Sequence, residues 1–448
     1  MRSNLLKYLD RRLPRYTSYP TAVQFNSEVD APIYRRWLER LPAAEPVSIY
    51  LHVPFCAELC LYCGCHTTVA RRYTPVAAYV ELLQREISLI AGFLDRPLIT
   101  EIHWGGGTPT MLRPQDLLQL TATLRANFTI VPATKTAIEI DPRSLTREHI
   151  AAMTEMGVTR ASLGVQDFEE QVQQAIGRRQ SFEQTERAVD GLRNAGITNI
   201  NLDLMYGLPH QTDATVARSA ERALTLDPDR IALFGYAHVP WMKHHQKLIS
   251  EQTLPGSSER FAQSQAAADV LVGAGYQRIG LDHFATGTDP LAQCQRQGRL
   301  HRNFQGYTTD ETPTLIGFGP SAIGSLPGGY VQNAANMVSY RQAIMADQPA
   351  TARGRALTAE DRLRGEIIER LMCDLNVDLA DICAAHATTT DHFALELAAI
   401  DELVNDGIAE RFDGRIKVPE HARAFVRAVC AVFDEHSSND EKRFSRAS

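Results

Sequence analysis

A regular alternation of short β-branched segments with longer amphipathic segments, from about residue 47 to 320, constrains the fold more than any other feature. Strands that alternate with helices in this way form parallel sheets with crossover helices. The chemically suggestive side chains of this region all follow predicted strand ends, which is where a barrel places its active site. The sequence therefore favours an α/β fold with a full or partial (β/α) barrel over an open doubly wound sheet.

Six strands and at least five helices follow from this pattern. Several of the helices have Thr or Pro near the start and Gly after the end, as helix boundaries commonly do. The strands are predicted at residues 47–53, 99–104, 136–140, 160–165, 199–205 and 230–236. The helices are predicted at residues 75–93, 114–128, 147–156, 182–196 and 212–226.

The same pattern divides the chain into three predicted parts. Residues 1–45 are rich in Arg, Tyr and Pro and are expected to form an arm wrapped on the body. Residues 46–345 are expected to form the barrel. Residues 346–448 are expected to form a mostly helical, winged-helix-like domain with a hairpin that turns at Asp413–Gly414. From His436 on, the chain is predicted to be disordered.

The charge balance argues against a general affinity for nucleic acid or anionic lipid. The net charge is −7, so there is no global basic field, and the C-terminal domain mixes acidic and basic residues evenly. The N-terminus does not have the pattern of a signal peptide, and the apolar segments are too short to cross a bilayer. We expect a cytoplasmic protein without a membrane partner. Because a barrel encloses its own site, we also expect a monomer.

Four cysteines lie close together directly after the first predicted strand. Cys56, Cys60, Cys63 and Cys65 have the spacing C-x3-C-x2-C-x-C, and a cytosolic chain of this size is not expected to build a disulfide framework. A structural zinc site would use four tetrahedral ligands, usually as paired C-x2-C motifs. An iron–sulfur cluster held by three cysteines leaves one iron open to a ligand. The spacing favours a [4Fe–4S] cluster on Cys56, Cys60 and Cys63, and zinc remains the alternative.

Further polar and glycine residues follow the next predicted strands. The run Gly105–Thr108 ends the second strand, where glycines let the backbone approach a ligand and are expected to leave N–H groups free for it. Glu139, Gln166 and Asp203 lie at or near the ends of the third, fourth and fifth strands. Each alone is explained by a salt bridge or a strand-end hydrogen bond. Together they are expected to form a polar ring at one mouth of the barrel.

The cysteine spacing on the loop after the first strand resembles the signature of the radical S-adenosylmethionine (SAM) superfamily. In that superfamily three cysteines hold three irons, the fourth iron binds the methionine part of SAM, and an electron from the cluster cleaves SAM to a 5′-deoxyadenosyl radical. Tyr62, an aromatic residue between the second and third cysteines, also fits. The glycine run resembles the superfamily's GGE-type motif, with Thr108 where that motif has Glu. The porphyrinogen branch of the superfamily shares this departure.

A longer series of ordered motifs resembles the oxygen-independent coproporphyrinogen III oxidase family. The resemblance covers about residues 14–345, includes the glycine run, and leaves the C-terminal domain in its expected place. The other motifs are PRYTSYPTA (14–22), SIYLHVPFCAELCLYCGCH (48–66), IEIDPR (138–143), SLGVQDF (162–168), DLMYGLPHQT (203–212), YAHVP (236–240), DHFA (282–285) and LHRNFQGYTT (300–309).

This resemblance implies two bound SAM molecules, one on the cluster and a second beside it. Cys65 matches an extra cysteine that the family needs for activity but does not use as a cluster ligand. The positions implied for the first SAM are Tyr50, Gly106, Glu139 and Ile323. The positions implied for the second SAM are Tyr62, Gly107, Thr108, Gln166, Arg178, Asp203 and Ala237.

The reaction implied is the anaerobic oxidative decarboxylation of coproporphyrinogen III to protoporphyrinogen IX in haem biosynthesis. Two propionates each lose one carbon dioxide, one hydrogen atom and one electron, and the cofactor performs the difficult chemistry. An unidentified electron donor, such as a flavodoxin or a ferredoxin, is an implied partner. Because the substrate is a tetracarboxylate, local cations are expected to bind it through charge-assisted hydrogen bonds. The candidates are Arg11, Arg12, Arg15, Arg299, His301 and Arg302.

Three other functions stay open at this point. Some relatives with the same cysteine loop are haem-binding chaperones, but these typically lack the residue corresponding to Cys65 and the N-terminal RYTSYPT segment, both of which are present here. Other close relatives use radical chemistry to open the haem ring. A zinc-stabilised winged-helix protein acting on nucleic acid is the third alternative, and the acidic net charge counts against it.

Overall fold

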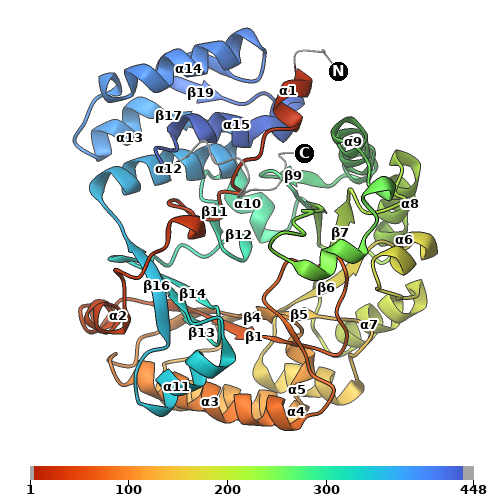
Figure 1. Ribbon diagram of the computed structural model, residues 1–448, viewed down its shortest axis with the longest axis vertical. Helices are drawn as coiled ribbons and strands as arrows, with labels where there is room; N and C mark the ends of the chain where they lie inside the picture. Colours follow the sequence, from red (N-terminus) through yellow and green to blue (C-terminus); the bar gives the residue numbers. More distant parts are fainter. Residues whose placement is uncertain (1–4, 437–448) are drawn as a thin grey trace.

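The computed structural model describes residues 5–436, so the predicted disorder after His436 lies outside the described residues. Within this range a twelve-stranded sheet curves around the centre of the molecule, with helices on its outer face (Figure 1). The strand order is β16-β15-β14-β13-β1-β4-β5-β6-β7-β8-β10-β9. Among the described strands, the two at the ends of this order do not pair with each other. The predicted α/β fold with a partial barrel is therefore confirmed.

Six parallel strands form the middle of the sheet, and all six predicted strands are confirmed to within two residues at each end. β1 is buried along nearly its whole length, as expected of a central parallel strand covered on both faces. The bounds are Val47–Val53 (β1), Ile99–Gly106 (β4), Lys135–Ile140 (β5), Arg160–Gln166 (β6), Asn199–Tyr206 (β7) and Arg230–Gly235 (β8).

Helices connect these strands across the outer face, and the five predicted helices are confirmed. Ser181 and Thr212 cap the N-termini of α7 and α8 through their side-chain oxygens, and Gly157 ends α5 in the left-handed conformation. The bounds are Thr74–Ala91 (α3), Pro114–Asn127 (α4), Arg147–Met156 (α5), Glu170–Ala175 (α6), Phe182–Asn194 (α7), Asp213–Leu224 (α8) and Ser257–Gly273 (α9).

Shorter strands extend the sheet on both sides. β13 runs parallel to β1, whereas β14, β15 and β16 follow as antiparallel strands, and β10 and β9 are antiparallel on the side of β8. Strands of three to six residues carry too little periodicity to be predicted from sequence. The bounds are Gln277–Ile279 (β9), His283–Ala285 (β10), Leu315–Phe318 (β13), Ile323–Leu326 (β14), Gly329–Asn333 (β15) and Thr351–Ala356 (β16).

Two short strand pairs and two helices complete this part of the chain. β2 and β3 pair in parallel beside the cysteines, and β11 and β12 form an antiparallel hairpin between the sheet and the C-terminal helices (Figure 1). The bounds are Phe55–Cys56 (β2), Thr68–Val69 (β3), His301–Asn303 (β11), Gly306–Thr308 (β12), Pro290–Arg296 (α10) and Met337–Met345 (α11).

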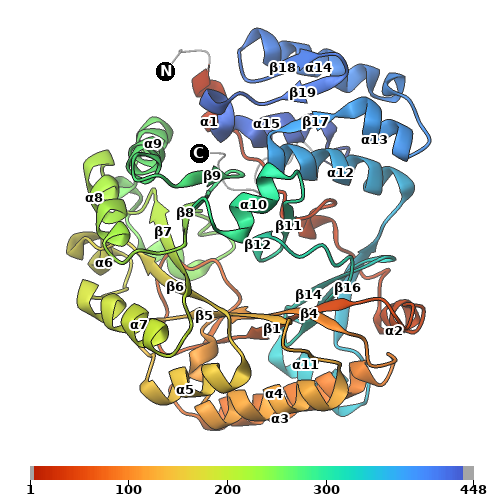
Figure 2. The ribbon, with the colours of Figure 1, turned by 180° about the vertical axis from the view of Figure 1, so that it is seen from behind.

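After β16 the chain forms a separate layer of helices around a small three-stranded sheet (Figure 2). Its order of helix, strand, two helices and a terminal hairpin is that of a winged helix, as predicted. Asp413 and Gly414 both have positive φ at the predicted hairpin turn, as a type I′ turn requires. The bounds are Ala359–Asp374 (α12), Asn376–Asp378 (β17), Leu379–Ala385 (α13), Ala394–Asn405 (α14), Glu410–Phe412 (β18), Arg415–Lys417 (β19) and Val426–Cys430 (α15).

The N-terminal arm contacts both layers. Its first part, with α1 (Leu6–Leu9), lies against the C-terminal helices in both views, and Leu9, Leu13 and Tyr16 share a buried apolar cluster with them (Figures 1 and 2). Its second part, with α2 (Ala31–Glu39), packs on the core of the large sheet. The arm therefore connects the two layers, and the division of the chain into three domains stays a prediction.

Candidate active site

A cavity of about 640 Å³ lies within the curve of the sheet, a volume in the usual range for small-molecule sites. All four neighbouring cysteines lie on its wall, so the structure brings the predicted metal ligands and the predicted polar ring to one space. The predicted cofactor residues that line the cavity are Tyr62, Gly106, Gly107, Thr108, Glu139, Gln166, Arg178, Asp203 and Ala237.

Two predicted cofactor residues lie beside the cavity rather than on its wall. The Tyr50 hydroxyl, in β1, forms a hydrogen bond with Nδ1 of His52 at 3.0 Å, and the Tyr50 ring lies 5.8 Å from that of His103. Ile323 begins β14 and pairs with Gln332 of β15. Both are half-buried next to the lining residues, so a direct contact with a ligand stays a prediction for them.

The cysteine loop, residues 54–69, is tied to the barrel along its length. Its two ends pair with each other through β2 and β3, where Cys56 lies opposite Val69. Further along, the backbone N–H of Leu61 donates to the carbonyl of Ile176 at 2.9 Å. These backbone hydrogen bonds fix the path of a segment that contains four cysteines in ten residues.

The segment after β8 also holds the cysteine loop, and the sequence analysis did not find this role. The Lys243 ammonium donates to the carbonyl of Cys65 at 2.8 Å, and Nε2 of His245 donates to the carbonyl of Cys63 at 2.8 Å. The Gln246 side chain donates to the carbonyl of Tyr62 at 2.9 Å. The basic and amide residues that follow YAHVP were the available signal, but no local rule connects them to carbonyl groups far away in the sequence.

The sulfur atoms of the loop lie beside donors and cations. Thr108 Oγ1 lies 3.6 Å from Cys56 Sγ, and Arg178 Nη1 lies 3.6 Å from Cys60 Sγ. Hydrogen bonds from the Cys65 thiol and amide, with Lys243 and Arg178 nearby, lower the pKa of the Cys63 thiol. The surroundings of Cys63 thus favour the thiolate, the form that binds metal, whereas burial raises the pKa of the Cys56 thiol to about 11.

The sulfur atoms of the loop do not form a preassembled zinc shell. Four thiolates around one zinc ion at about 2.3 Å would lie about 3.8 Å from one another. Among residues 5–436, no three of the cysteine sulfurs come within 4.8 Å of each other.

The glycine run does not do what its sequence predicts. The backbone N–H groups of Gly106, Gly107 and Thr108 donate to Glu139, Val53 and Phe55, so the expectation that they are free for a ligand is wrong. The glycines are required for a different reason. A Cβ on Gly107 would lie 2.6 Å from the carbonyl oxygen of Phe55, and Gly106 has φ of +113°. The run lets the strand end pass under the cysteine loop.

The predicted polar ring is present in the cavity. Glu139 accepts hydrogen bonds from Nε2 of His103 and from the N–H of Gly106, each at 3.1 Å, and although burial opposes it, these bonds lower the pKa of Glu139. Asp203 accepts from Asn201 at 2.8 Å, but burial and the nearby Glu139 raise the pKa of Asp203 to about 7. The two carboxyls therefore offer an ionised acceptor and a group that titrates near neutral pH.

Arg178 connects this ring to the cysteines. Its Nη2 donates to the carbonyl of Gly164 at 2.6 Å and its Nη1 to Asp141 at 3.2 Å, while its buried Nε has no hydrogen-bond partner among the described residues. Asp141 also pairs with Arg143 at 2.7 Å. Gln166, at φ +72°, lies beside Arg178 at the end of β6. The sequence predicted Arg178 and Gln166 but not Asp141 or Arg143, although IEIDPR contains both.

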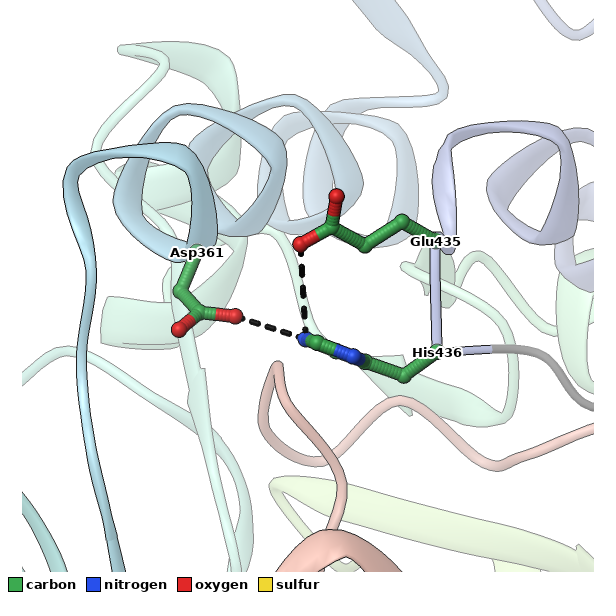
Figure 3. A group of neighbouring side chains, drawn as sticks. All are labelled: Asp361, Glu435 and His436. Atoms are coloured by element: carbon green, nitrogen blue, oxygen red, sulfur yellow. Dashed lines mark hydrogen bonds and ion pairs between the residues drawn. The ribbon is translucent and has the colours of Figure 1, made fainter.

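A second group of titratable side chains lies near the C-terminal end of the described chain. Figure 3 shows His436 pointing at Asp361, and their Nε2 and Oδ1 atoms are 2.7 Å apart, with Glu435 at 3.6 Å. Asp361 also accepts from the backbone N–H of Thr358 at the start of α12. The group ties the end of the chain to this helix, and its donors are satisfied within the protein.

Comparisons with known proteins agree with this geometry. The model of the radical SAM superfamily matches residues 50–223. The chain is 50% identical to oxygen-independent coproporphyrinogen III oxidase of Bradyrhizobium diazoefficiens over 100% of both chains, and 40% identical to anaerobic coproporphyrinogen III oxidase 1 of Cereibacter sphaeroides over 99% of this chain and 98% of that one. The chain belongs to the oxygen-independent coproporphyrinogen III oxidase family.

A solved structure supports the same assignment. Coproporphyrinogen III oxidase from Escherichia coli, a radical SAM enzyme, superposes with a TM-score of 0.91 at 36% identity, covering 94% of this chain and 98% of that one. Membership of this oxidase family favours an oxidoreductase over the haem chaperone and the zinc-binding protein. Among the described residues, no helix has both the length and the apolar character that crossing a membrane requires.

Proposed function

We propose that the protein catalyses the anaerobic oxidative decarboxylation of coproporphyrinogen III to protoporphyrinogen IX, a step of haem biosynthesis. One observation carries this proposal: three cysteines with radical SAM spacing and the polar ring face one cavity, in a chain that matches coproporphyrinogen III oxidases over its full length. In this reaction two propionates each lose one carbon dioxide, one hydrogen atom and one electron.

Cys56, Cys60 and Cys63 are assigned as the ligands of a [4Fe–4S] cluster, since their sulfurs lie at the cavity beside Thr108 and Arg178. When bound, the cluster and SAM supply a carbon radical able to remove a hydrogen atom from an unactivated propionate. Cys65 stays outside the ligand set and is assigned a role required for activity. Its backbone N–H donates to the sulfur of Cys63 at 3.4 Å, which supports a role in holding that ligand.

Two SAM molecules are proposed to share the polar part of the cavity. Ionised Glu139, near the end of β5, is suited to accept hydrogen bonds from the first, together with Tyr50 in β1, Gly106 at the end of β4 and Ile323 at the start of β14. The buried and partly unsatisfied guanidinium of Arg178 is suited to the second. The remaining residues assigned to the second SAM are Tyr62, Gly107, Thr108, Gln166, Asp203 and Ala237.

The partners follow from the chemistry. The substrate is coproporphyrinogen III, and a one-electron donor such as a flavodoxin or a ferredoxin reduces the cluster. The proposed enzyme acts in the cytoplasm as a monomer, because the cavity is built by one chain, and it has no nucleic-acid partner, because its net charge is −7. The arm (1–45), barrel (46–345) and C-terminal domain (346–448) remain the proposed division of the chain.

The test is an anaerobic assay of the reconstituted protein. Iron, sulfide, dithionite, SAM and coproporphyrinogen III are supplied, and protoporphyrinogen IX and 5′-deoxyadenosine are quantified together. We expect both products from the natural sequence and neither from Cys60→Ser. Cys294→Ser is the matched control because it removes a buried thiol in α10 and should keep both products.

The other outcomes separate the alternatives. Deoxyadenosine without a porphyrin product would keep the radical chemistry but move the substrate elsewhere, with haem the next to test. Neither product, from protein that holds a full cluster, would favour a haem-binding chaperone.

A further inference from the structure

One wall of the cavity contains none of the predicted cofactor residues. It is formed by the arm, β10 and the β11–β12 hairpin. Arg15, His283, Asn303, Gln305 and Tyr307 line it. These residues come from three distant parts of the sequence, and the hairpin lies between the sheet and the C-terminal helices (Figure 1). A tetracarboxylate substrate needs cations on its binding surface, and Arg15 is the arginine that lines this wall.

Three of the six cations that the sequence offered already have partners elsewhere, and a fourth is exposed. Arg299 is exposed and pairs with Glu311 at 2.7 Å, and His301 pairs with Glu369 at 3.1 Å. Arg12 lies over the ring of Trp241 at 5.1 Å, and Arg11 is exposed on the arm. Two candidates, Arg15 and Arg302, remain.

Arg302 lies next to Tyr307, behind the lining of the cavity, and is half-buried. Its Nε and Nη1 atoms are buried, and neither has a hydrogen-bond partner among the described residues. Its guanidinium carbon lies 4.4 Å from the centre of the Tyr307 ring, and that ring lines the cavity. A buried donor left unsatisfied is costly, so such groups in folded proteins usually await a ligand or a water molecule.

Four charged side chains interact around Arg302, namely Arg15, Asp282, Arg302 and Arg427. Although burial opposes it, His283, Arg302 and Arg15 lower the pKa of the Asp282 carboxyl to about 2. Burial, with Arg15 and Arg302 nearby, lowers the pKa of Arg427 to about 10. We call these four residues the arginine cluster. Because Arg15 and Arg302 both act on Asp282, a further carboxylate placed beside them would be attracted by two guanidinium groups.

Arg15 connects the cluster to the open cavity. It is exposed, it lines the cavity, and its Nη2 donates to the carbonyl of Gly235 at the end of β8 at 3.1 Å. One nitrogen is thereby anchored, which orients the guanidinium while other N–H groups stay available. Planar guanidinium groups bind carboxylates with paired hydrogen bonds.

We propose that Arg302 and Arg15 form a subsite that binds a carboxylate of the tetrapyrrole substrate on this wall. This inference rests on the proposed function, since it names how the same cavity recognises its substrate. The subsite selects a ligand with an ionised carboxylate and should not bind the corresponding ester.

The test measures binding of coproporphyrin III, the stable oxidised form of the substrate, to anaerobically reconstituted holoenzyme. Fluorescence titration gives Kd for the acid and for its tetramethyl ester. We expect Arg302→Gln to raise the Kd of the acid about 10- to 100-fold, as loss of a charged hydrogen-bond partner does. Arg302→Lys should raise this Kd less, because lysine keeps the positive charge but lacks the paired donors of the guanidinium group. Arg296→Gln, an exposed arginine of α10, is the matched control and should change Kd less than about twofold.

A second variant, Arg15→Gln, keeps the test decisive if the Arg302→Gln protein loses its iron–sulfur cluster. Arg15 is exposed on the arm, so its replacement should leave the fold and the iron content unchanged. It should weaken binding of the acid several-fold, and the double variant should weaken it further. Natural affinity for the acid in both single variants would overturn the subsite, as would equal affinity of the natural enzyme for acid and ester. If binding of the acid depends on Arg302 but no protoporphyrinogen IX forms, the proposed function fails while the subsite stands.

Discussion

The cysteine loop lines the cavity, and the arginine cluster reaches it through Arg15, but the two are assembled in opposite ways. The loop places Cys56, Cys60, Cys63 and Cys65 within ten residues, next to the ends of neighbouring parallel strands. The arginine cluster brings together Arg15 of the arm, Asp282 before β10, Arg302 of β11 and Arg427 of α15. Its members are spread over nearly the whole chain.

This difference follows from what each part must do. A reactive cofactor needs ligands at fixed short distances, which a local loop provides most reliably. A flexible substrate with charged arms needs cations placed around a large volume, and only contacts between distant segments can place them. The cofactor part of the site, which contains the cysteine loop, can therefore be predicted from the spacing of its residues. The substrate part, which contains the arginine cluster, becomes visible only in the folded structure.

The largest expected effect tests the cofactor part. Arg178 is buried and contacts Asp141, Gly164 and the sulfur of Cys60, so Arg178→Gln removes one of the two arginines that pair with Asp141 and leaves the carbonyl of Gly164 without its partner. Breaking a buried pair of this kind costs about 3–5 kcal/mol. Displacing the site by about an ångström also costs roughly 100-fold in rate. We expect deoxyadenosine formation to fall at least about 100-fold, with less iron bound per chain.

Arg218→Gln is the control for that change. Arg218 pairs with Glu169 at 3.1 Å on the surface of α8, where an ion pair contributes less than about 1 kcal/mol. Iron content and deoxyadenosine formation should stay close to those of the natural enzyme. An Arg178→Gln variant as active as this control would show that the cysteine loop does not depend on its neighbours. The loop would then be fully local, and its difference from the dispersed arginine cluster would be larger than proposed.

Much of the fold and of the cofactor part could be predicted from the sequence. The six parallel strands and five of the helices lie within two residues of their predicted bounds, because each is long enough to show its own periodicity. Glu139, Gln166 and Asp203 meet at the cavity because parallel strands end at the same edge of the sheet. The cysteine spacing predicted the cluster ligands, and these cysteines lie on the wall of the cavity.

The remainder depends on contacts that no local pattern encodes. The strands β13 to β16 are too short to be predicted, and they extend the sheet by pairing alone. The N–H groups of the glycine run are used within the protein because the cysteine loop lies directly above them, which only the packed structure shows. Of the six candidate carboxylate ligands, the sequence could not tell Arg302 from Arg299, since their difference lies in burial and in partners.

A second prediction concerns a buried carboxyl whose partners, like the members of the arginine cluster, lie far away in the sequence. Glu86, in α3, is buried and accepts hydrogen bonds from the N–H of Gly319 and from Asn333 and Tyr340, all more than 200 residues away. Burial raises the pKa of Glu86 to about 7 despite these bonds. The folded protein thus keeps a proton there that the unfolded chain releases above about pH 4.

Stability should therefore fall as the pH rises from about 4 to 7 and level off above that, because the raised pKa belongs to the folded state. The contribution of Glu86 is on the order of 2–3 kcal/mol over this range. Urea unfolding of Glu86→Gln at pH 5 and pH 8 should show a smaller fall. Burial also raises the pKa of Asp203 to about 7 and that of Asp167 to about 6, so these two carboxyls contribute to the fall that remains. Glu81→Gln, on the exposed face of α3, should keep the full slope.

The smallest expected effect has the opposite sign to the others and tests the arginine cluster. Asp282 is its single carboxylate, hydrogen-bonded to Nδ1 of His283 at 2.8 Å, and it competes with a substrate carboxylate for the same cations. Asp282→Asn should therefore bind coproporphyrin III about threefold more tightly, a change typical of one partly solvated charge. It should also lower the stability of the folded protein, because the arginines lose their compensating charge.

Asp95→Asn removes one negative charge from an exposed position and controls for the overall change in net charge. If it tightens binding as much as Asp282→Asn, the gain is a general charge effect and the arginine cluster has no special part in it. Weaker binding by Asp282→Asn would instead mean that Asp282 orients Arg15 and Arg302 rather than competing with the substrate. The substrate part of the cavity would then depend on fixed geometry as strictly as the cysteine loop does, and the difference between the two would lie only in how far apart their residues are in the sequence.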